Sequence, residues 1–421
     1  MSTKADIRQR IDAVLARRFP NNGIAPPHYG ELLSEYAKAR IGPPHLLEEL
    51  ETGDEGKLWS CIWEAMLYRK LCALGFTPTG PTKRAGQNRP DFRIEHDGRV
   101  IWIEAVVPGP QGIPADYLEP PVAGAEVRAK RKPDQERVLR CTSAIADKRL
   151  KLDRYREQGI VGPKDCTVIA VNICRLSDWD IDGNGISQFP LSMEAVFPIG
   201  PLAVMMSREG KIDGPARHMP RFAIQKASGK EIDTANFLNP TFAGVSALIQ
   251  AHQNYMYERD LILNSIHNPL ATNPLPPGLL QPHKEFVAQP EGNGYRLREI
   301  RLEARIRELT DSVRRRFHGR EDRGVRQLTP VEAGDFVGER NKCQENVNRW
   351  CFMREHFRHL RVTGWLISGD CVLDKHFVVD VGDGQLVDVT PMPDDAKRTF
   401  LRHDGTEDEF LAMPGQLILA R

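Results

Sequence analysis

Apolar positions in the first half of the chain predict helices followed by a buried strand. Residues 57–75, KLWSCIWEAMLYRKLCALG, have helical periodicity and end at Gly75, a common helix stop. The apolar stripe of this helix comprises Trp59, Trp63, Met66 and Leu74. Residues 136–157 predict a second, basic helix, and the apolar run CTVIAVNI at 166–173 is typical of a strand buried on both faces. Residues 1–54 are expected to add short helices broken by proline-rich turns.

Between these helices, residues 89–108 (RPDFRIEHDGRVIWIEAVVP) alternate as a β-hairpin does. A two-residue Asp97-Gly98 loop fixes the register, so that His96 faces Arg99. Counting back along both strands places Asp91 directly opposite Glu104. The opposite face of the hairpin then carries only apolar side chains: Phe92, Ile94, Ile101 and Ile103.

Beyond residue 175 the pattern predicts shorter elements. We expect strands near 195–200, 221–227 and 261–266, and a helix near 245–255 (VSALIQAHQNY). The proline-rich segment 269–285 is typical of a domain boundary, and a charged amphipathic helix follows at 297–317.

The sequence therefore predicts an α/β fold, a mixed sheet flanked by helices, with a smaller α+β domain after it. The expected divisions are a helical extension (1–54), a main domain (55–290) and a C-terminal domain (297–421).

The amino-acid composition is typical of a globular protein. The 421 residues are 40% apolar and 27% charged, as in globular proteins, and 58 Lys and Arg nearly balance 57 Asp and Glu. The eight cysteines form no CxxC pair or zinc-type cluster, and no apolar run approaches bilayer length. We therefore expect a cytoplasmic protein with free thiols and no membrane partner. Nothing in the sequence sets its oligomeric state.

Several well-known catalytic and nucleotide-binding motifs are absent from the sequence. There is no Walker loop, GxGxxG fingerprint, nucleophile elbow or HExxH, so nucleotide hydrolysis, NAD chemistry and zinc proteolysis have no support.

Asp91 and Glu104 are the first candidate site. Two carboxylates side by side on a strand pair repel each other unless a cation lies between them, and a divalent metal is the usual solution. The simpler alternative is a half-solvated acid pair that binds no metal.

The residues around this pair resemble the PD-(D/E)xK, or restriction-endonuclease-like, nuclease superfamily. The resemblance covers about residues 55–175: a helix with an acid (Glu64), then Pro90-Asp91, the hairpin, IEAVV, a basic helix and a buried strand. It implies hydrolysis of phosphodiester bonds in DNA or RNA, with Mg²⁺ or Mn²⁺ held by Asp91 and Glu104, and Glu64 completing the metal shell.

The chain departs from this pattern at one position. The superfamily has a catalytic lysine two residues after the Glu, where this chain has Val106. Lys148, on the following helix, is the preferred replacement, because relocation of this lysine is known in the superfamily. Lys83 and Lys151 are weaker alternatives, and a catalytically silent site is a further one.

A basic segment lies in sequence between Glu104 and Lys148. We expect it to bind nucleic-acid phosphates without reading base sequence. A solvated loop is the simpler alternative. The candidate residues are Arg128, Lys130, Arg131, Lys132 and Arg140.

The second candidate site comprises Cys343, His376 and Asp388. Cys343 lies at a predicted helix start, where backbone amides favour a thiolate. His376 begins a predicted strand and Asp388 lies in the next. A three-residue loop, 382–384, pairs Val378 with Asp388 and brings His376 and Asp388 to one face; a two-residue loop does not. A buried cysteine and an unrelated strand histidine are the alternative.

This region, about 335–395, resembles transglutaminase-like and related papain-type thiol folds, with a Cys at a helix start, a Gly-Trp strand, a His strand and an Asp strand. The resemblance implies Cys343 as nucleophile, His376 as base and Asp388 as its orienting group. Gln344 or Asn346 could assist an oxyanion.

Two functions from different classes follow. The first is a metal-dependent nuclease fused to a thiol domain, which by analogy alone suits a bacterial defence or conflict effector. The second is a thiol peptidase or acyltransferase with a peptide or protein substrate. In that case the nuclease-like part is a silent platform for nucleic acid or a partner.

Overall fold

The computed structural model describes residues 4–20, 22–23, 25–39, 46–80, 89–119, 132–176, 183–207, 216–253, 261–292, 294–318, 325–327, 329–330, 343–353, 361–368, 372–381, 385–390 and 399–419. The chain divides into two compact units, Met1–Ile300 (unit 1) and Arg301–Arg421 (unit 2). Among the described helices, none is both long enough and apolar enough to cross a membrane.

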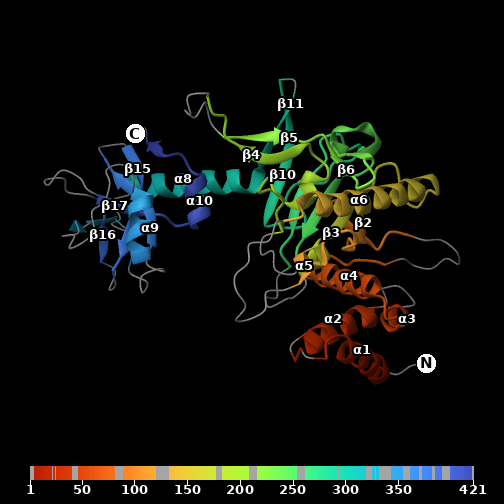
Figure 1. Ribbon diagram of the computed structural model, residues 1–421. Coiled ribbons are helices and arrows are strands. Elements are labelled where there is room, and N and C mark those ends of the chain that lie inside the picture. The colour runs from red at the N-terminus through yellow and green to blue at the C-terminus, as the bar shows by residue number, and fades with distance from the viewer. Residues whose placement is uncertain are drawn as a thin grey trace. The chain divides into compact units, whose positions relative to one another are not determined.

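Unit 1 is built on a mixed sheet of seven strands in the order β1-β2-β3-β8-β9-β10-β11 (Figure 1). The pairs β2/β3, β3/β8 and β9/β10 are parallel and the other neighbours antiparallel. The strands are β1 (Phe92–His96), β2 (Arg99–Val106), β3 (Cys166–Asn172), β8 (Ala247–Ala251), β9 (Asn264–His267), β10 (Lys284–Glu291) and β11 (Gly294–Glu299). The expected α/β class, a mixed sheet flanked by helices, is confirmed.

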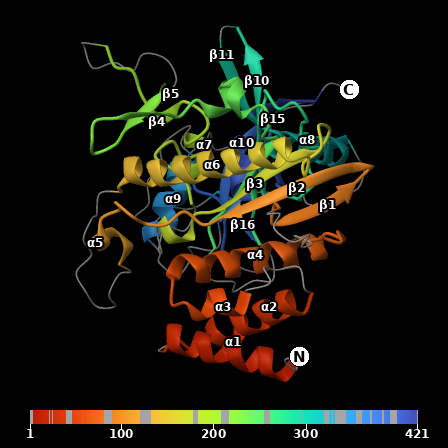
Figure 2. The same ribbon diagram turned by 90° about the vertical axis from the view of Figure 1, so that its right-hand side faces the viewer.

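Two helices lie on opposite faces of this sheet (Figures 1 and 2). α4 (Glu55–Ala73) packs on one face, and α6 (Asp134–Glu157) packs on the other. The hairpin residues Phe92 and Ile103 join the α4 core, and Trp102 joins the α6 core. Glu104 is an even-numbered residue like Trp102, so its side chain lies on the α6 face.

Local signals explain where α4 begins and how it is held. The Asp54 carboxylate accepts hydrogen bonds from the Gly56 and Lys57 amides at 2.6 and 3.1 Å, which caps the helix. Gly75 follows the helix with φ of 85°, a left-handed conformation that favours glycine. The buried Trp63 indole donates to the Ala170 carbonyl oxygen of β3 at 3.0 Å, and so ties α4 to the sheet.

The helices before α4 belong to the same core. α1 (Lys4–Arg18), α2 (Ala25–Ala39) and α3 (Leu46–Glu51) bury apolar residues that form one cluster with α4 and the sheet. The described helices of segment 1–54 therefore pack into the core of unit 1.

The remaining elements of unit 1 are short. They are α5 (Ala115–Leu118), α7 (Leu191–Glu194), β4 (Ile199–Ala203), β5 (Arg217–Pro220), β6 (Ala223–Gln225) and β7 (Glu231–Asp233). The pairs β4/β5 and β6/β7 form two small antiparallel sheets.

Two expectations about the middle of the chain are wrong. The helix expected near 245–255 is β8, which pairs with β3 and β9 and is buried at all five positions. The proline-rich segment 269–285 lies inside unit 1 and leads into β10, which pairs with β11. The division falls at Ile300, so the expected boundary at 290–297 would separate these two paired strands.

Unit 2 contains a curled, largely antiparallel sheet in the order β12-β17-β14-β15-β16-β13, with β18 also pairing with β15. Its helices are α8 (Ile300–His318), α9 (Cys343–Met353) and α10 (Glu407–Ala412). Its strands are β12 (Val325–Gln327), β13 (Thr329–Pro330), β14 (Arg361–Ile367), β15 (Val372–Asp380), β16 (Leu386–Asp388), β17 (Thr399–Arg402) and β18 (Gln416–Ile418).

Candidate functional sites

The hairpin places Asp91 and Glu104 as the sequence predicts. Phe92 pairs with Ile103 and His96 with Arg99, so Asp91, the residue before β1, lies across from Glu104. The turn residues Asp97 and Gly98 both have positive φ, 47° and 73°, as the predicted two-residue loop requires. The Asp91 Oδ2 atom accepts a hydrogen bond from the Ala105 amide at 2.7 Å, which holds the two strand ends together.

Two lysines of α6 reach Glu104. The Nζ atoms of Lys148 and Lys151 lie 2.8 and 2.5 Å from Glu104 Oε1. The Glu104 side chain is fully buried, whereas the side chains of Lys148 and Lys151 are 20% and 32% exposed, so the site borders solvent at these two lysines. Val106, the residue at the position of the motif lysine, packs against the α6-side core.

Glu64 extends from α4 toward the same acids. Its Oε2 atom accepts a hydrogen bond from the Tyr36 hydroxyl of α2 at 3.0 Å. Burial, followed by the charge of Asp91, raises the Glu64 pKa to about 8. Burial and the charge of Glu104 likewise raise the Asp91 pKa to about 6. The Glu64 carboxyl is therefore mostly protonated at neutral pH, which reduces its repulsion with Asp91.

The donor set of this site suits a hard divalent cation. Glu104 Oε2 is buried and has no hydrogen-bond partner among the described residues, and a bound cation would satisfy it. Within the described chain, no three His, Cys, Asp or Glu side chains are already close enough to form a metal site. Glu64, Asp91 and Glu104 would therefore have to move together to bind one ion.

The structure describes only part of the basic segment. Arg128, Lys130, Arg131 and the alternative Lys83 lie outside the described residues. Lys132 Nζ donates to the Asn184 carbonyl oxygen at 2.8 Å, and Arg140 Nε donates to that of Gly109 at 2.8 Å. Each of these two side chains therefore contacts a backbone carbonyl near the amino-terminal end of α6, and their role in binding phosphates stays a prediction.

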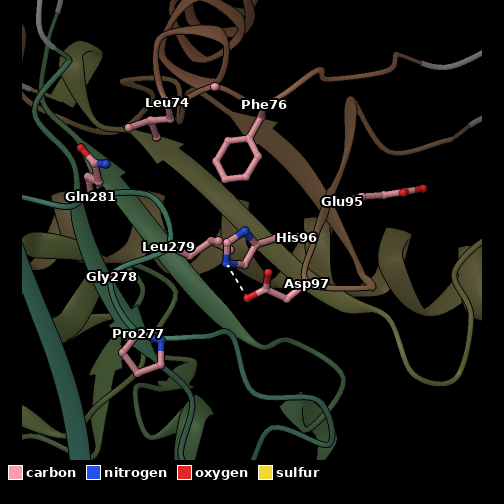
Figure 3. Close-up of a pocket in the computed structure, with 10 residues that line it drawn as sticks. Leu74, Phe76, Glu95, His96, Asp97, Pro277, Gly278, Leu279 and Gln281 are labelled. Carbon is pink, nitrogen blue, oxygen red and sulfur yellow. Dashed lines mark ion pairs between the residues drawn. The ribbon is translucent and has the colours of Figure 1, made fainter.

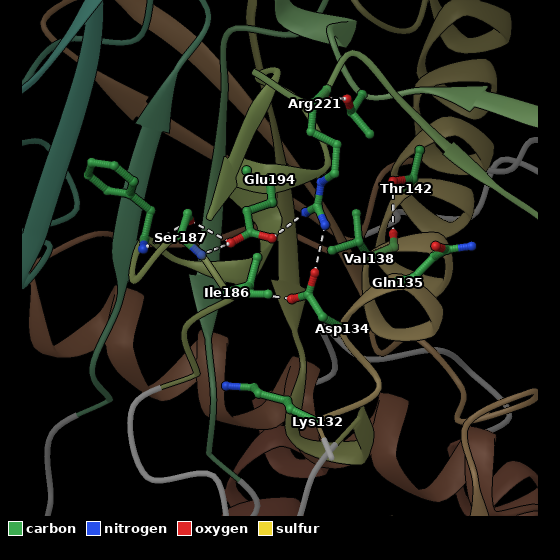
Figure 4. A network of polar contacts seen from close by, with 12 residues as sticks. Lys132, Asp134, Gln135, Val138, Thr142, Ile186, Ser187, Glu194 and Arg221 are labelled. Atoms are coloured by element: carbon green, nitrogen blue, oxygen red, sulfur yellow. Dashed lines mark hydrogen bonds and ion pairs between the residues drawn. The ribbon is translucent and has the colours of Figure 1, made fainter. Parts of the chain in front are cut away.

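A buried polar network fixes the same end of α6 (Figure 4). The Arg221 guanidinium bridges two carboxylates, contacting Asp134 Oδ2 at 2.6 Å and also Glu194 Oε2. Glu194 Oε1 accepts from the Ser187 amide at 2.7 Å, and Asp134 Oδ1 accepts from the Ile186 amide at 3.0 Å. The network positions the helix that carries Lys148 and Lys151, and hydrophobic periodicity gives no sign of it.

A hollow of about 580 Å³ lies at the turn of the hairpin (Figure 3). It is lined by Phe76, which follows α4, by Glu95, His96 and Asp97 of the hairpin, and by Gly278 from the loop before β10. Asp91 is at the opposite end of β1, about 17 Å along the strand. The hollow is therefore not part of the acid site.

In unit 2, the predicted triad residues come together. β16 pairs with β15 through Val379–Val387 and Asp380–Leu386, the register that a three-residue loop requires. The loop residues 382–384 themselves lie outside the described residues. The His376 imidazole donates from Nε2 to Asp388 Oδ2 at 2.8 Å, and both side chains are buried.

Cys343, the first residue of α9, completes this arrangement. Burial raises the pKa of the Cys343 thiol, but hydrogen bonds from His376 and from the Phe377 and Gln344 amides outweigh it, so the pKa lies below its usual value. Burial lowers the His376 pKa, but the hydrogen bonds to Asp388 and Cys343 outweigh burial and raise it to about 9. The two shifts together favour a thiolate and imidazolium pair at neutral pH.

The place of Cys343 follows from the pairing of β15. This strand pairs with β18 at Val372–Asp374 and with β16 at Val379 and Asp380. Phe377 lies between these two contacts, and its amide donates to the Cys343 sulfur. Of the two oxyanion candidates, Gln344 contributes a backbone amide to the sulfur, whereas Asn346 is buried.

Two residues of the acid site, Lys151 and Tyr36, have contacts that the sequence did not predict. Lys151 ranked below Lys148, although helical spacing of three places both on one face of α6. Tyr36 received no role, because it lies on a separate helix far from Glu64 in sequence.

No protein-family model, curated protein or solved structure matches this chain. Function must therefore be inferred from the two sites themselves.

Proposed function

We propose that unit 1 is a metal-dependent nuclease that hydrolyses phosphodiester bonds of DNA or RNA at Asp91 and Glu104. One observation carries this proposal: Lys148 and Lys151 donate to Glu104, and so supply the cation that Val106 cannot. The chain order α4, β1, β2, α6, β3, with β2 and β3 parallel and an antiparallel bridge from Thr79 to Arg93, supports a restriction-endonuclease-like core.

The residues divide the chemistry as follows. Asp91, Glu104 and Glu64 would hold Mg²⁺ or Mn²⁺, which when bound supplies Lewis-acid activation of water and of the phosphate. Burial lowers the Lys151 pKa, but Glu104 and Asp91 outweigh it and raise the pKa, so this lysine stays cationic. Its charge and that of Lys148 would stabilise the negative charge that develops on the phosphate oxygens.

The test is cleavage of mixed DNA and RNA with Mg²⁺ or Mn²⁺ by wild type and by Asp91→Ala, Glu104→Ala and Lys148→Ala. We expect metal-dependent cleavage that each substitution reduces by about 100-fold or more. Arg154→Ala is the matched control, because it removes an exposed cation from the same helix. Folded wild-type protein that never cleaves would refute the nuclease and leave a nucleic-acid-binding platform.

We propose a second activity for unit 2, thiol-dependent acyl transfer as a peptidase or acyltransferase on a peptide or protein. The hydrogen-bonded series Cys343, His376, Asp388 supports it. In this mechanism the Cys343 thiolate attacks a carbonyl carbon, and the His376 imidazolium returns a proton to the leaving group. Asp388 keeps the imidazole oriented.

Alkylation by iodoacetamide tests this site. Cys72 is the matched control, because it is an exposed free cysteine. At pH 6.5 an unperturbed thiol is only about 1% thiolate, so Cys343 can exceed Cys72 in alkylation rate by up to about 100-fold. A rate for Cys343 equal to or below that of Cys72 would remove the thiolate from the proposal.

The proposed location is the cytoplasm, supported by the free thiols among the described cysteines. A role as a defence or conflict effector rests on the joining of the two chemistries in one chain.

A further inference from the structure

Tyr155 of α6 has a buried hydroxyl without a hydrogen-bond partner among the described residues. Only 3% of the residue is exposed, and its ring packs in the α6-side core. More than nine in ten buried polar groups in proteins are hydrogen bonded, so such a group requires an explanation. The acid site contains a second one, the Glu104 Oε2 atom.

Helical spacing places Tyr155 beside the two lysines of the acid site. Lys148, Lys151 and Tyr155 are three and then four residues apart, which puts them on one face of α6. Lys151 joins the groups directly: its Nζ atom lies 2.5 Å from Glu104 Oε1 and 5.8 Å from the Tyr155 ring centroid. Tyr155 therefore lies one turn beyond Lys151, on the face turned toward the acids.

The chemistry of this hydroxyl is that of a permanent donor. Burial, followed by the charges of Glu104 and Asp91, raises its pKa well above the ordinary value. The group therefore keeps its proton at neutral pH. A neutral O–H beside two ammonium groups is suited to an anionic oxygen, to which the lysines supply charge and the hydroxyl a directed hydrogen bond.

We propose that Tyr155 is a further catalytic residue of unit 1. Its hydroxyl would donate a hydrogen bond to a non-bridging oxygen of the scissile phosphate. This inference rests on the proposed nuclease function. It also accounts for a hydroxyl with no partner among the described residues, since its partner would arrive with the substrate. The substrate would approach from the side of Lys148 and Lys151, whose side chains are 20% and 32% exposed.

Tyr155→Phe tests the proposal with two separate readouts. In cleavage assays with Mg²⁺, loss of a hydrogen bond to a charged oxygen is expected to lower kcat by about 10- to 100-fold, with KM little changed. In thermal unfolding without substrate, the Phe variant is expected to be as stable as wild type or more stable, because it no longer buries a hydroxyl that has no partner within the described part of the chain. Tyr117→Phe, a buried tyrosine of the same core, is the control.

Different results would refute the role of Tyr155 and the nuclease function of unit 1. Wild-type protein that does not cleave refutes the nuclease, and Tyr155 is then tested by binding alone. A phosphorothioate oligonucleotide with Mg²⁺ should raise the Tm of wild type more than that of Tyr155→Phe. Equal Tm gains, or active wild type with an equally active Phe variant, would overturn the role of Tyr155. A lower Tm for the Phe variant without substrate would instead assign the hydroxyl a structural bond.

Discussion

Glu64 is expected to make unit 1 less stable as pH rises from 6 to 9. Burial and the charge of Asp91 raise the Glu64 pKa from an ordinary 4.5 to about 8. A carboxyl with a raised pKa binds its proton more tightly in the folded state. The contribution of Glu64 to the free energy of unfolding is therefore fully present below its pKa in the unfolded state. It is lost as the pH rises through its pKa in the folded state. By this linkage the loss in unfolding free energy between pH 6 and 9 is at most about 3 kcal/mol.

Differential scanning calorimetry at pH 6, 7.5 and 9 measures this effect. The transition of unit 1 can be identified as the one that Ile103→Val moves, since Ile103 lies in its core. A loss of 3 kcal/mol in a unit of this size lowers Tm by roughly 5–10 °C. Glu64→Gln keeps the size of the side chain but has no proton to lose, so its Tm is expected to fall much less over this range.

Two controls accompany the comparison of wild type with Glu64→Gln. Glu35→Gln removes a surface carboxylate that pairs with Arg69, and it is expected to follow the wild-type pH dependence. Mg²⁺ or Mn²⁺ at pH 9 is expected to restore stability to wild type and less so to Glu64→Gln, because a cation replaces the lost proton. Parallel pH curves for wild type and Glu64→Gln would show that this carboxyl is ordinarily solvated, and the reasoning from burial would fail.

Two further predictions concern unit 2. Gly364→Ala is expected to destabilise this unit by about 1–3 kcal/mol or more, because a Cβ there would overlap the Phe400 ring and a neighbouring backbone carbonyl; a Tm equal to wild type would contradict it. Asp388→Asn is expected to lower the His376 pKa from about 9, since the bond to Asp388 raises it. The Asn variant should therefore alkylate Cys343 more slowly at pH 6.5–8, and an unchanged pH profile would argue against the triad.

The hairpin was predictable because its signals are local. An Asp-Gly loop allows one register, and strict alternation then decides which residues meet, so the pairing of Asp91 with Glu104 follows from the sequence alone. The same reasoning worked for β15 and β16, where only a three-residue loop brings His376 and Asp388 to one face. The two-residue repeat of a strand determines which side chains share a face over a few residues, whatever the rest of the fold is.

Features set by the rest of the fold were not predictable in this way. β8 is covered on both faces, so Ala247–Ala251 shows no alternation, and a short apolar run of this kind cannot be told from a helix by periodicity. The Tyr36 bond to Glu64 and the Arg221 bridge join segments far apart in sequence. A sequence by itself gives no measure of such distances, which depend on how helices pack on the sheet.

The amide of Phe377 offers a direct view of the second site. Because this N–H donates to the Cys343 sulfur, the NMR chemical shift of its proton depends on the charge of that one atom. β15 is held by β18 on one side of this residue and by β16 on the other, so the amide itself has little freedom to move. Protonation, oxidation or acylation of Cys343 would each shift one backbone resonance, and the thiol could be followed through its chemistry without any added label.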